Sequence, residues 1–173
     1  MTERQKYKVL QKYEHFELRT YEACVVAQIA MPMNYSSATS GAFRYLYNYI
    51  SKGNQTSTPI AMTAPVIAAT EGSLDSQEWS ISFVMPAGSD IKGLPIPVDS
   101  KVLLHEVPKQ DCVALSFRGR ATIGLSKRKE VELRNHAQKD HFVLSKETRI
   151  CRFDPPFKPG FLQYNEIVIP LQV

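Results

Sequence analysis

The sequence has no apolar run of about 18 residues or more, the length that a membrane-spanning helix needs. Residues 1–11 are polar and charged and lack the apolar core of a secretory signal, so a cytoplasmic protein is expected. The net charge of +4 is mild, and the basic triplet at residues 127–129 is followed directly by Glu130 and Glu132. Such a mixture is typical of a solvated helix face, so no nucleic-acid partner is predicted.

Signatures of metal centres and of catalysis are also scarce. The three cysteines, Cys24, Cys112 and Cys151, lie far apart and form no C-x-x-C pair. Reduced and mostly buried thiols are therefore expected, and neither a zinc knuckle nor a redox motif is. The four histidines lack the H-E-x-x-H spacing, and the sequence has no G-x-S-x-G, no phosphate-binding glycine loop and no dinucleotide fingerprint.

What the sequence does contain is a globular composition and a proline-flanked strand pattern. A hydrophobic fraction of 43% and a charged fraction of 22% predict one folded domain over residues 1–173. Near the middle, residues 59–66 read PIAMTAPV, and residues 81–86 read ISFVMP. Because proline is confined to edge strands, strand ends and bulges, this pattern predicts a free sheet rim that could receive a flat apolar ligand.

The remaining chain alternates strand patterns with only two helical ones. One helix is expected from the capping residues Asn34, Ser36 and Ser37 through Ser51, and a second from about residue 121 or 125 to 136. The expected strands cover residues 14–19, 23–31, 60–68, 79–85, 102–107, 112–118, 148–153 and 166–173. This order predicts an α+β fold of two duplicated halves, each strand-strand-helix-strand-strand and about 80 residues long.

Several segments together resemble the SOUL / heme-binding protein family, in family order and over nearly the whole chain. They are YEHFELRTY at residues 13–21, IAMTAPV at 60–66, FVMP at 83–86, PIPVD at 95–99 with Val102, DPPFKP at 154–159, and NEIV at 165–168. The resemblance implies a distorted eight-stranded antiparallel β-barrel flanked by two α-helices, with pseudo-twofold duplicated half-domains. It also implies an intracellular carrier or buffer that binds heme or another tetrapyrrole non-covalently in a shallow apolar groove beside the first helix.

A heme site needs an apolar wall and one or two cations for the propionates. The first helix and the following strand offer the wall, for which the candidates are Phe43, Leu46, Tyr47, Ile50 and Met62. Cations on or after that helix are Arg44 and Lys52, and Lys158 matches a basic position in the closing proline-rich segment of the family. The competing interpretation is that Phe43, Leu46 and Ile50 form the buried face of an amphipathic helix.

Iron ligation is not assigned by the sequence. Some family members carry a histidine after the arginine of the first motif, where this chain has Thr20, a poor ligand for heme iron. Binding through the groove without a protein axial ligand is therefore expected. Glu166, on a mostly apolar closing strand, has two interpretations: a structural hydrogen-bond anchor or an acid in the ligand pocket.

Two alternatives from other functional classes stay open. One is an enzyme that processes tetrapyrroles, by metal removal or ring opening, which would need a proton donor or a metal ligand in the groove. The other is a small-molecule sensor or partner-binding module, because similar duplicated folds bind amphipathic cations in transcription regulators. The sequence carries no DNA-binding segment of the kind that the regulator version needs, and a protein partner is left unidentified.

Overall fold

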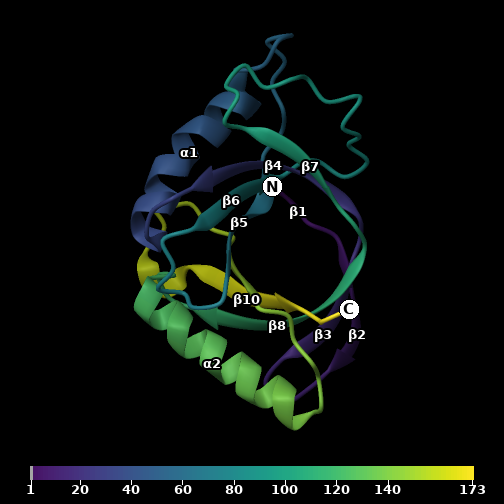
Figure 1. The fold of residues 1–173 in the computed structure, drawn as a ribbon, viewed down its shortest axis with the longest axis vertical. Coiled ribbons are helices and arrows are strands. Elements are labelled where there is room, and N and C mark those ends of the chain that lie inside the picture. Colours follow the sequence, from purple (N-terminus) through teal and green to yellow (C-terminus); the bar gives the residue numbers. More distant parts are fainter. Residues whose placement is uncertain (1) are drawn as a thin grey trace.

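The computed structural model describes residues 2–173, and ten strands in it form one sheet that curls around its own concave face (Figure 1). The strand path is β2-β3-β8-β10-β9-β5-β6-β4-β7, and β1 pairs with β5 in parallel. The strand bounds are β1 Glu3–Arg4, β2 Tyr7–Lys12, β3 Glu17–Tyr21, β4 Cys24–Met31, β5 Thr63–Glu71, β6 Trp79–Val84, β7 Leu103–Val107, β8 Gln110–Arg118, β9 Glu147–Arg152 and β10 Tyr164–Pro170. The helices are α1 Tyr35–Ser51 and α2 Ile123–Lys139, with a short 3₁₀ turn η1 at Gly160–Leu162.

The predicted α+β duplication is confirmed, with two more strands than expected. One half is β3-β4-α1-β5-β6 and the other is β7-β8-α2-β9-β10, and the path is symmetric about the β5–β9 pair. The first strand of each half pairs with the other half, β3 with β8 and β7 with β4. The extra strands β1 and β2 come from the polar amino terminus, and the path runs from β2 to β7 as a curled sheet.

Both helices begin where the capping chemistry indicates. The Asn34 side chain accepts a hydrogen bond from the Ser37 N–H at 2.9 Å, and Thr122 caps α2 by accepting from the Leu125 N–H at 3.2 Å. Leu46 at 0% and Leu133 at 0% exposure anchor the helices in the main core, which lies between them and one face of the sheet. No helix among residues 2–173 is long and apolar enough to cross a membrane.

The proline-flanked segment does not form the free sheet rim that the sequence predicts. Pro59 lies before β5, and the Ile60 N–H donates to the Ile50 carbonyl at 2.7 Å, which ties the segment to the end of α1. Pro65 lies inside β5, at the point where the register with β6 shifts. A bulge tolerates proline because the ladder is interrupted there. The start of β5 also has a strand partner, because β1 pairs in parallel with Thr63 and Ala64.

Candidate functional site

The exposed side of α1 carries an aromatic pair. Ala42, Leu46 and Ile50 are buried in the core, so these positions form the inner face of the helix. Phe43 and Tyr47, four residues apart, leave that face: their side chains are 42% and 52% exposed and their rings stack at 5.6 Å between centroids. Leu46 and Ile50, both predicted as ligand contacts, lie beneath the surface, whereas Phe43 and Tyr47 present a flat apolar surface to solvent.

Met62 is expected on the same side of α1 as this pair. The Phe43 ring meets the buried ring of Phe83 on β6 edge-on, at 5.7 Å between centroids. Val84, the neighbour of Phe83, pairs with Thr63 at the start of β5, and Met62 directly precedes Thr63. Met62 is half-buried against the main core. The structure thus places Phe43 and Tyr47 together, whereas Met62 is placed only by its sequence position before β5.

Two cations converge on the neighbouring tyrosine. The Arg44 guanidinium lies over the Tyr45 ring at 4.9 Å and donates to its hydroxyl at 3.2 Å, and the Lys101 ammonium lies over the same ring at 5.3 Å. The hydrogen bond from Arg44 and the charge of Lys101 lower the pKa of Tyr45. Lys101 was missed from the sequence because it follows α1 by fifty residues and belongs to no motif. Because Tyr45 in its phenol form is neutral, Arg44 and Lys101 can still bind an anionic ligand.

The other two predicted cations are placed differently. Lys52 ends α1 as its capping residue, with an unusual positive φ of 145°. Lys158 lies in the loop between β9 and β10, where its ammonium pairs with Asp154 at 3.0 Å. That loop packs on the β8–α2 connection, since the Gly119 N–H donates to the Gln163 carbonyl at 3.0 Å. The same connection contacts the start of α1, through the Tyr35 hydroxyl and the Ala121 carbonyl at 2.8 Å.

The position of the family histidine holds no iron ligand in this chain. Thr20, at the position of the family histidine, is buried on β3 and donates its hydroxyl hydrogen bond to Asp111. Residues 2–173 contain no group of three or more histidine, cysteine, aspartate or glutamate side chains that could hold a metal ion. His15 and His136 stack on each other at 4.0 Å, between the β2–β3 turn and α2.

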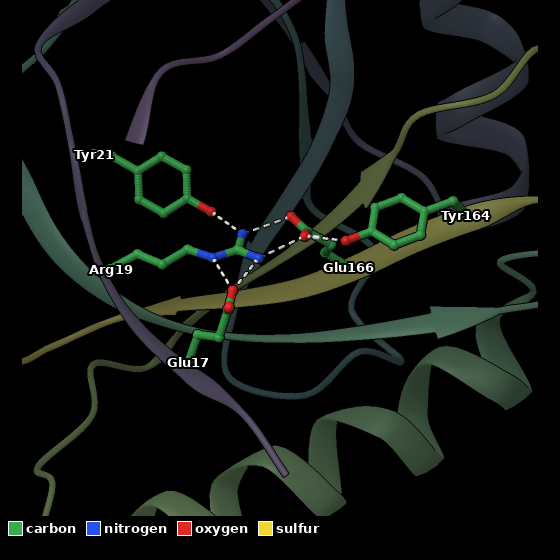
Figure 2. Close-up of polar contacts among 5 residues, drawn as sticks. All are labelled: Glu17, Arg19, Tyr21, Tyr164 and Glu166. Carbon is green, nitrogen blue, oxygen red and sulfur yellow. Dashed lines mark hydrogen bonds and ion pairs between the residues drawn. The ribbon is translucent and has the colours of Figure 1, made fainter. Parts of the chain in front are cut away.

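A buried polar cluster occupies the concave face of the sheet (Figure 2). Because side chains alternate along a strand, Glu17, Arg19 and Tyr21 of β3 share one face, as do Tyr164 and Glu166 of β10. The Arg19 guanidinium donates to both Glu166 oxygens at 2.9 and 2.8 Å, to Glu17 at 2.9 and 2.8 Å, and to the Tyr21 hydroxyl at 2.8 Å. The Tyr164 hydroxyl donates to Glu166 at 2.6 Å.

Arg19 and Glu166 are deeply buried and bind each other. Arg19 is 3% and Glu166 is 2% exposed, and both oxygens of Glu166 accept hydrogen bonds from the Arg19 guanidinium (Figure 2). Burial alone would lower the pKa of Arg19, but the hydrogen bonds and charge of Glu166 raise it above its ordinary value. Burial, with Glu166, raises the pKa of Tyr164 to about 12. Of the two interpretations of Glu166, the geometry matches the structural anchor.

The amino-terminal segment covers this cluster. The Arg19 guanidinium lies over the Tyr7 ring at 4.0 Å, and the Arg4 guanidinium lies over the rings of Phe153 and Tyr164 at 4.9 and 5.6 Å. Between this segment and the sheet a cavity of about 20 Å³ remains. The amino-terminal segment therefore covers part of the concave face, and beside it a cavity of about 390 Å³, lined by Glu17, Arg19 and Tyr164, opens at the other side of Tyr7.

Comparisons with solved structures agree with this architecture. The C-terminal domain of EcmrR is 12% identical, with a TM-score of 0.66 and coverage of 96% of this chain and 98% of that one. A hydrolase encoded by lin2189 from Listeria innocua is 11% identical, with a TM-score of 0.64 and 94% coverage of each chain. SAV2435, solved bound to tetraphenylphosphonium, is 14% identical, with a TM-score of 0.54 and coverage of 91% and 93%. At these identities the likeness shows a shared fold.

No match was found among curated proteins. A family model described as SOUL heme-binding protein matches residues 2–170. That match covers nearly the whole chain, including both halves of the duplication and the amino-terminal strands. The chain belongs to the SOUL heme-binding protein family.

Proposed function

We propose that the chain binds heme or a related tetrapyrrole, non-covalently, on the shallow apolar surface of α1 and acts as a cytoplasmic carrier or buffer. The observation that carries the proposal is the exposed, stacked pair of Phe43 and Tyr47. Two aromatic rings held parallel in water offer a flat apolar surface to a planar macrocycle. Covering them with a ligand removes that surface from water, the main favourable term in binding apolar groups.

We propose that the two cations at Tyr45 meet the anionic edge of a tetrapyrrole. Arg44 is exposed on the outer side of α1, and its contacts and those of Lys101 are with the phenol of Tyr45. A propionate would exchange this neutral partner for a charged one, which makes a shorter and stronger hydrogen bond. Lys158 would first have to leave Asp154, so we assign it a smaller share of the binding energy.

We further propose that affinity rests on the macrocycle face and the propionates, without a protein axial ligand. Thr20 supports this view because its hydroxyl is engaged by Asp111. A cation sensor is supported less well, because the buried carboxylate that would attract a lipophilic cation, Glu166, is already paired with Arg19. An enzyme would need a proton donor in the groove, and Glu166 lies instead on the concave face of the sheet.

Hemin titration of the purified protein tests the proposal. We expect a saturable shift of the Soret band at micromolar hemin, and at least about tenfold weaker binding in Phe43→Ala/Tyr47→Ala, because most of the apolar contact area is lost. Val131→Ala is the matched control, since Val131 is a 57% exposed apolar residue on α2. Absence of a saturable shift, or equal weakening in the control, contradicts the proposed site. A parallel titration with tetraphenylphosphonium tests the sensor alternative.

Ionisation of Tyr45 gives a second, independent readout. The nearby cations lower its pKa in the free protein, so Tyr45 should ionise before ordinary tyrosines in an ultraviolet pH titration. If propionates bind Arg44 and Lys101, their negative charge opposes this effect and the pKa of Tyr45 rises when a tetrapyrrole binds. Difference titration of wild type and Tyr45→Phe, with and without a metal-free porphyrin, isolates this group. An unchanged Tyr45 titration in the saturated complex contradicts the assignment of the cations.

A further inference from the structure

The loop between β9 and β10 exposes two phenylalanines. Phe157 is 88% and Phe161 is 77% exposed, more than any other aromatic side chain among the exposed large hydrophobic residues of the described chain. They lie four residues apart, and Leu162 beside them is 45% exposed. Isolated apolar residues on a surface need no explanation, but adjacent ones that project from a loop indicate a contact with another apolar phase.

This exposure does not result from a loose loop. The Lys158 N–H donates to the Pro155 carbonyl at 3.1 Å, and the Leu162 N–H donates to the Pro159 carbonyl at 2.9 Å. The Gln163 side chain donates to the Lys158 carbonyl at 2.9 Å, and the Asp154 carboxylate accepts from the Tyr164 N–H at 2.7 Å. The loop is therefore held in shape before any contact, which lowers the entropy cost of binding.

The charges around the loop are mostly positive. Residues 154–164 and the packed segment 118–120 contain three cationic side chains, Arg118, Arg120 and Lys158, and one acidic side chain, Asp154. Asp154 is engaged by Lys158. The Arg120 side chain lies against Gly160, directly between the two phenylalanines in sequence. Apolar residues on a loop that also carries long cationic side chains suit an anionic lipid surface, because the rings enter the interface and the cations meet the headgroups.

A second apolar loop shows why the charge matters. Ile96 and Val98 are 58% and 67% exposed in residues 90–101. That segment has two acidic and two basic side chains, Asp90, Asp99, Lys92 and Lys101, so its charges balance. It offers apolar area without attraction to an anionic surface, and it provides a control inside the same molecule.

We propose that the β9–β10 loop docks the protein on anionic membranes, with Phe157 and Phe161 inserted at the interface and Arg118, Arg120 and Lys158 facing the lipid headgroups. The inference shares only Lys158 with the proposed tetrapyrrole site, whose aromatic surface is assigned to α1. Docking through a single short loop with few cations gives reversible association, because stable anchoring takes a stronger pair of signals.

Co-sedimentation with vesicles tests this surface. Wild type should pellet with vesicles of phosphatidylcholine and phosphatidylserine, less with phosphatidylcholine alone, and less again as salt is raised, because salt screens the headgroup attraction. Phe157→Ser/Phe161→Ser should reduce the partition coefficient about tenfold or more, since the apolar contribution is lost. Ile96→Ser/Val98→Ser, the matched control, should bind as wild type, and thermal melts verify that both variants fold.

The outcomes separate the candidate occupants of the loop. Failure of wild type to pellet with anionic vesicles at low salt overturns the proposal, as does equal binding by the loop variant. If the loop variant changes only the oligomeric state, seen by size-exclusion chromatography, the loop is a contact between copies of this chain and the membrane proposal is wrong. Hemin titration of the loop variant should match wild type, which keeps this result distinct from the proposed function.

Discussion

Glu166 and Arg19 form the most deeply buried charge pair described in the structure. The two side chains are 3% and 4% exposed, and they join β10 to β3 through two hydrogen bonds of 2.8 and 2.9 Å. Desolvating both charges costs free energy that their attraction roughly offsets, so the pair need not add net stability. Removing one partner is different, because it leaves the other charge buried without full compensation.

We therefore expect Glu166→Gln to lower the free energy of unfolding by about 3 kcal/mol, near the low end for a broken buried pair, because Glu17 still holds Arg19. The double variant Arg19→Met/Glu166→Leu should be more stable than Glu166→Gln, since no buried charge is left unpaired. Urea denaturation measures both. Asp75→Asn, which breaks an exposed pair with Lys127, should change stability by less than about 1 kcal/mol. A Glu166→Gln midpoint equal to that of wild type would contradict this assignment.

Individual residues differ in how far the sequence could place them. Helical spacing groups Phe43 with Ala42, Leu46 and Ile50, but the structure turns the Phe43 ring outward while the other three are buried. The reason is that one helix face is wider than the contact that β4 and β6 provide, so a residue at its edge can lie in solvent. Lys101 joins Arg44 only through the fold, because residues so distant in sequence have no shared pattern.

The start of α1 controls the geometry of the proposed binding surface. Asn34 accepts from the Ser37 N–H, which satisfies one of the four donors that a helix start leaves unpaired. Phe43 and Tyr47 depend on α1 for their stacking, because a helix brings side chains four residues apart next to each other on one side. A weakened cap would thus loosen the element that positions both rings.

Asn34→Ala should lower the free energy of unfolding by about 1 kcal/mol, and Asn34→Asp should stay close to wild type because its carboxylate can accept the same hydrogen bond. Chemical denaturation followed by circular dichroism measures the difference. Thr122→Ala removes the corresponding cap of α2 and should cost a similar amount, while leaving hemin affinity unchanged. Equal stability of Asn34→Ala and Asn34→Asp would show that the cap contributes nothing.

Buried strands could be predicted from the sequence, whereas an exposed edge strand could not. The central strands were predicted because their valine and isoleucine runs are buried, as in β4 and β10. β2 was missed because almost all of its residues are exposed, so no apolar alternation marks it. β2 lies at the edge of the sheet and pairs only with β3 on the strand path. An exposed edge strand forms its backbone hydrogen bonds with few constraints on its side chains, so its sequence shows no clear pattern.

The whole molecule has two cores, one on each face of the curled sheet. The larger lies beneath α1 and α2, and the smaller lies on the concave face around Ile67, Cys112 and Cys151. The amino-terminal segment covers one side of the smaller core through Arg4 and Tyr7. Burial raises the pKa of the Cys151 thiol, and raises that of Cys112 to about 11, so both should be unreactive in the closed molecule.

A thiol reagent should therefore label Cys24 first, because it is only half-buried. Cys112 at 0% and Cys151 at 3% exposure should react only when the structure opens. In a Cys24→Ser background, Arg4→Ala/Tyr7→Ala should speed the labelling of Cys151 by about tenfold, because the cover over the concave face is weakened. Lys6→Ala, on an exposed side chain of the same segment, is the control. Labelling rates that do not change would show that the segment does not guard this face.

The sequence by itself determined the fold class, the duplicated order of strands and helices, the start of α1 and the family, because these depend on local periodicity, capping residues and short motifs. Only the tertiary structure decided which side of α1 faces solvent, that Lys101 meets Arg44, that Glu166 is an anchor paired with Arg19, and that the polar amino terminus covers part of the concave face. The physical reason is that these features arise from contacts between residues distant in the chain. Sequence neighbours carry no record of such contacts, whereas packing and desolvation in the folded chain fix them.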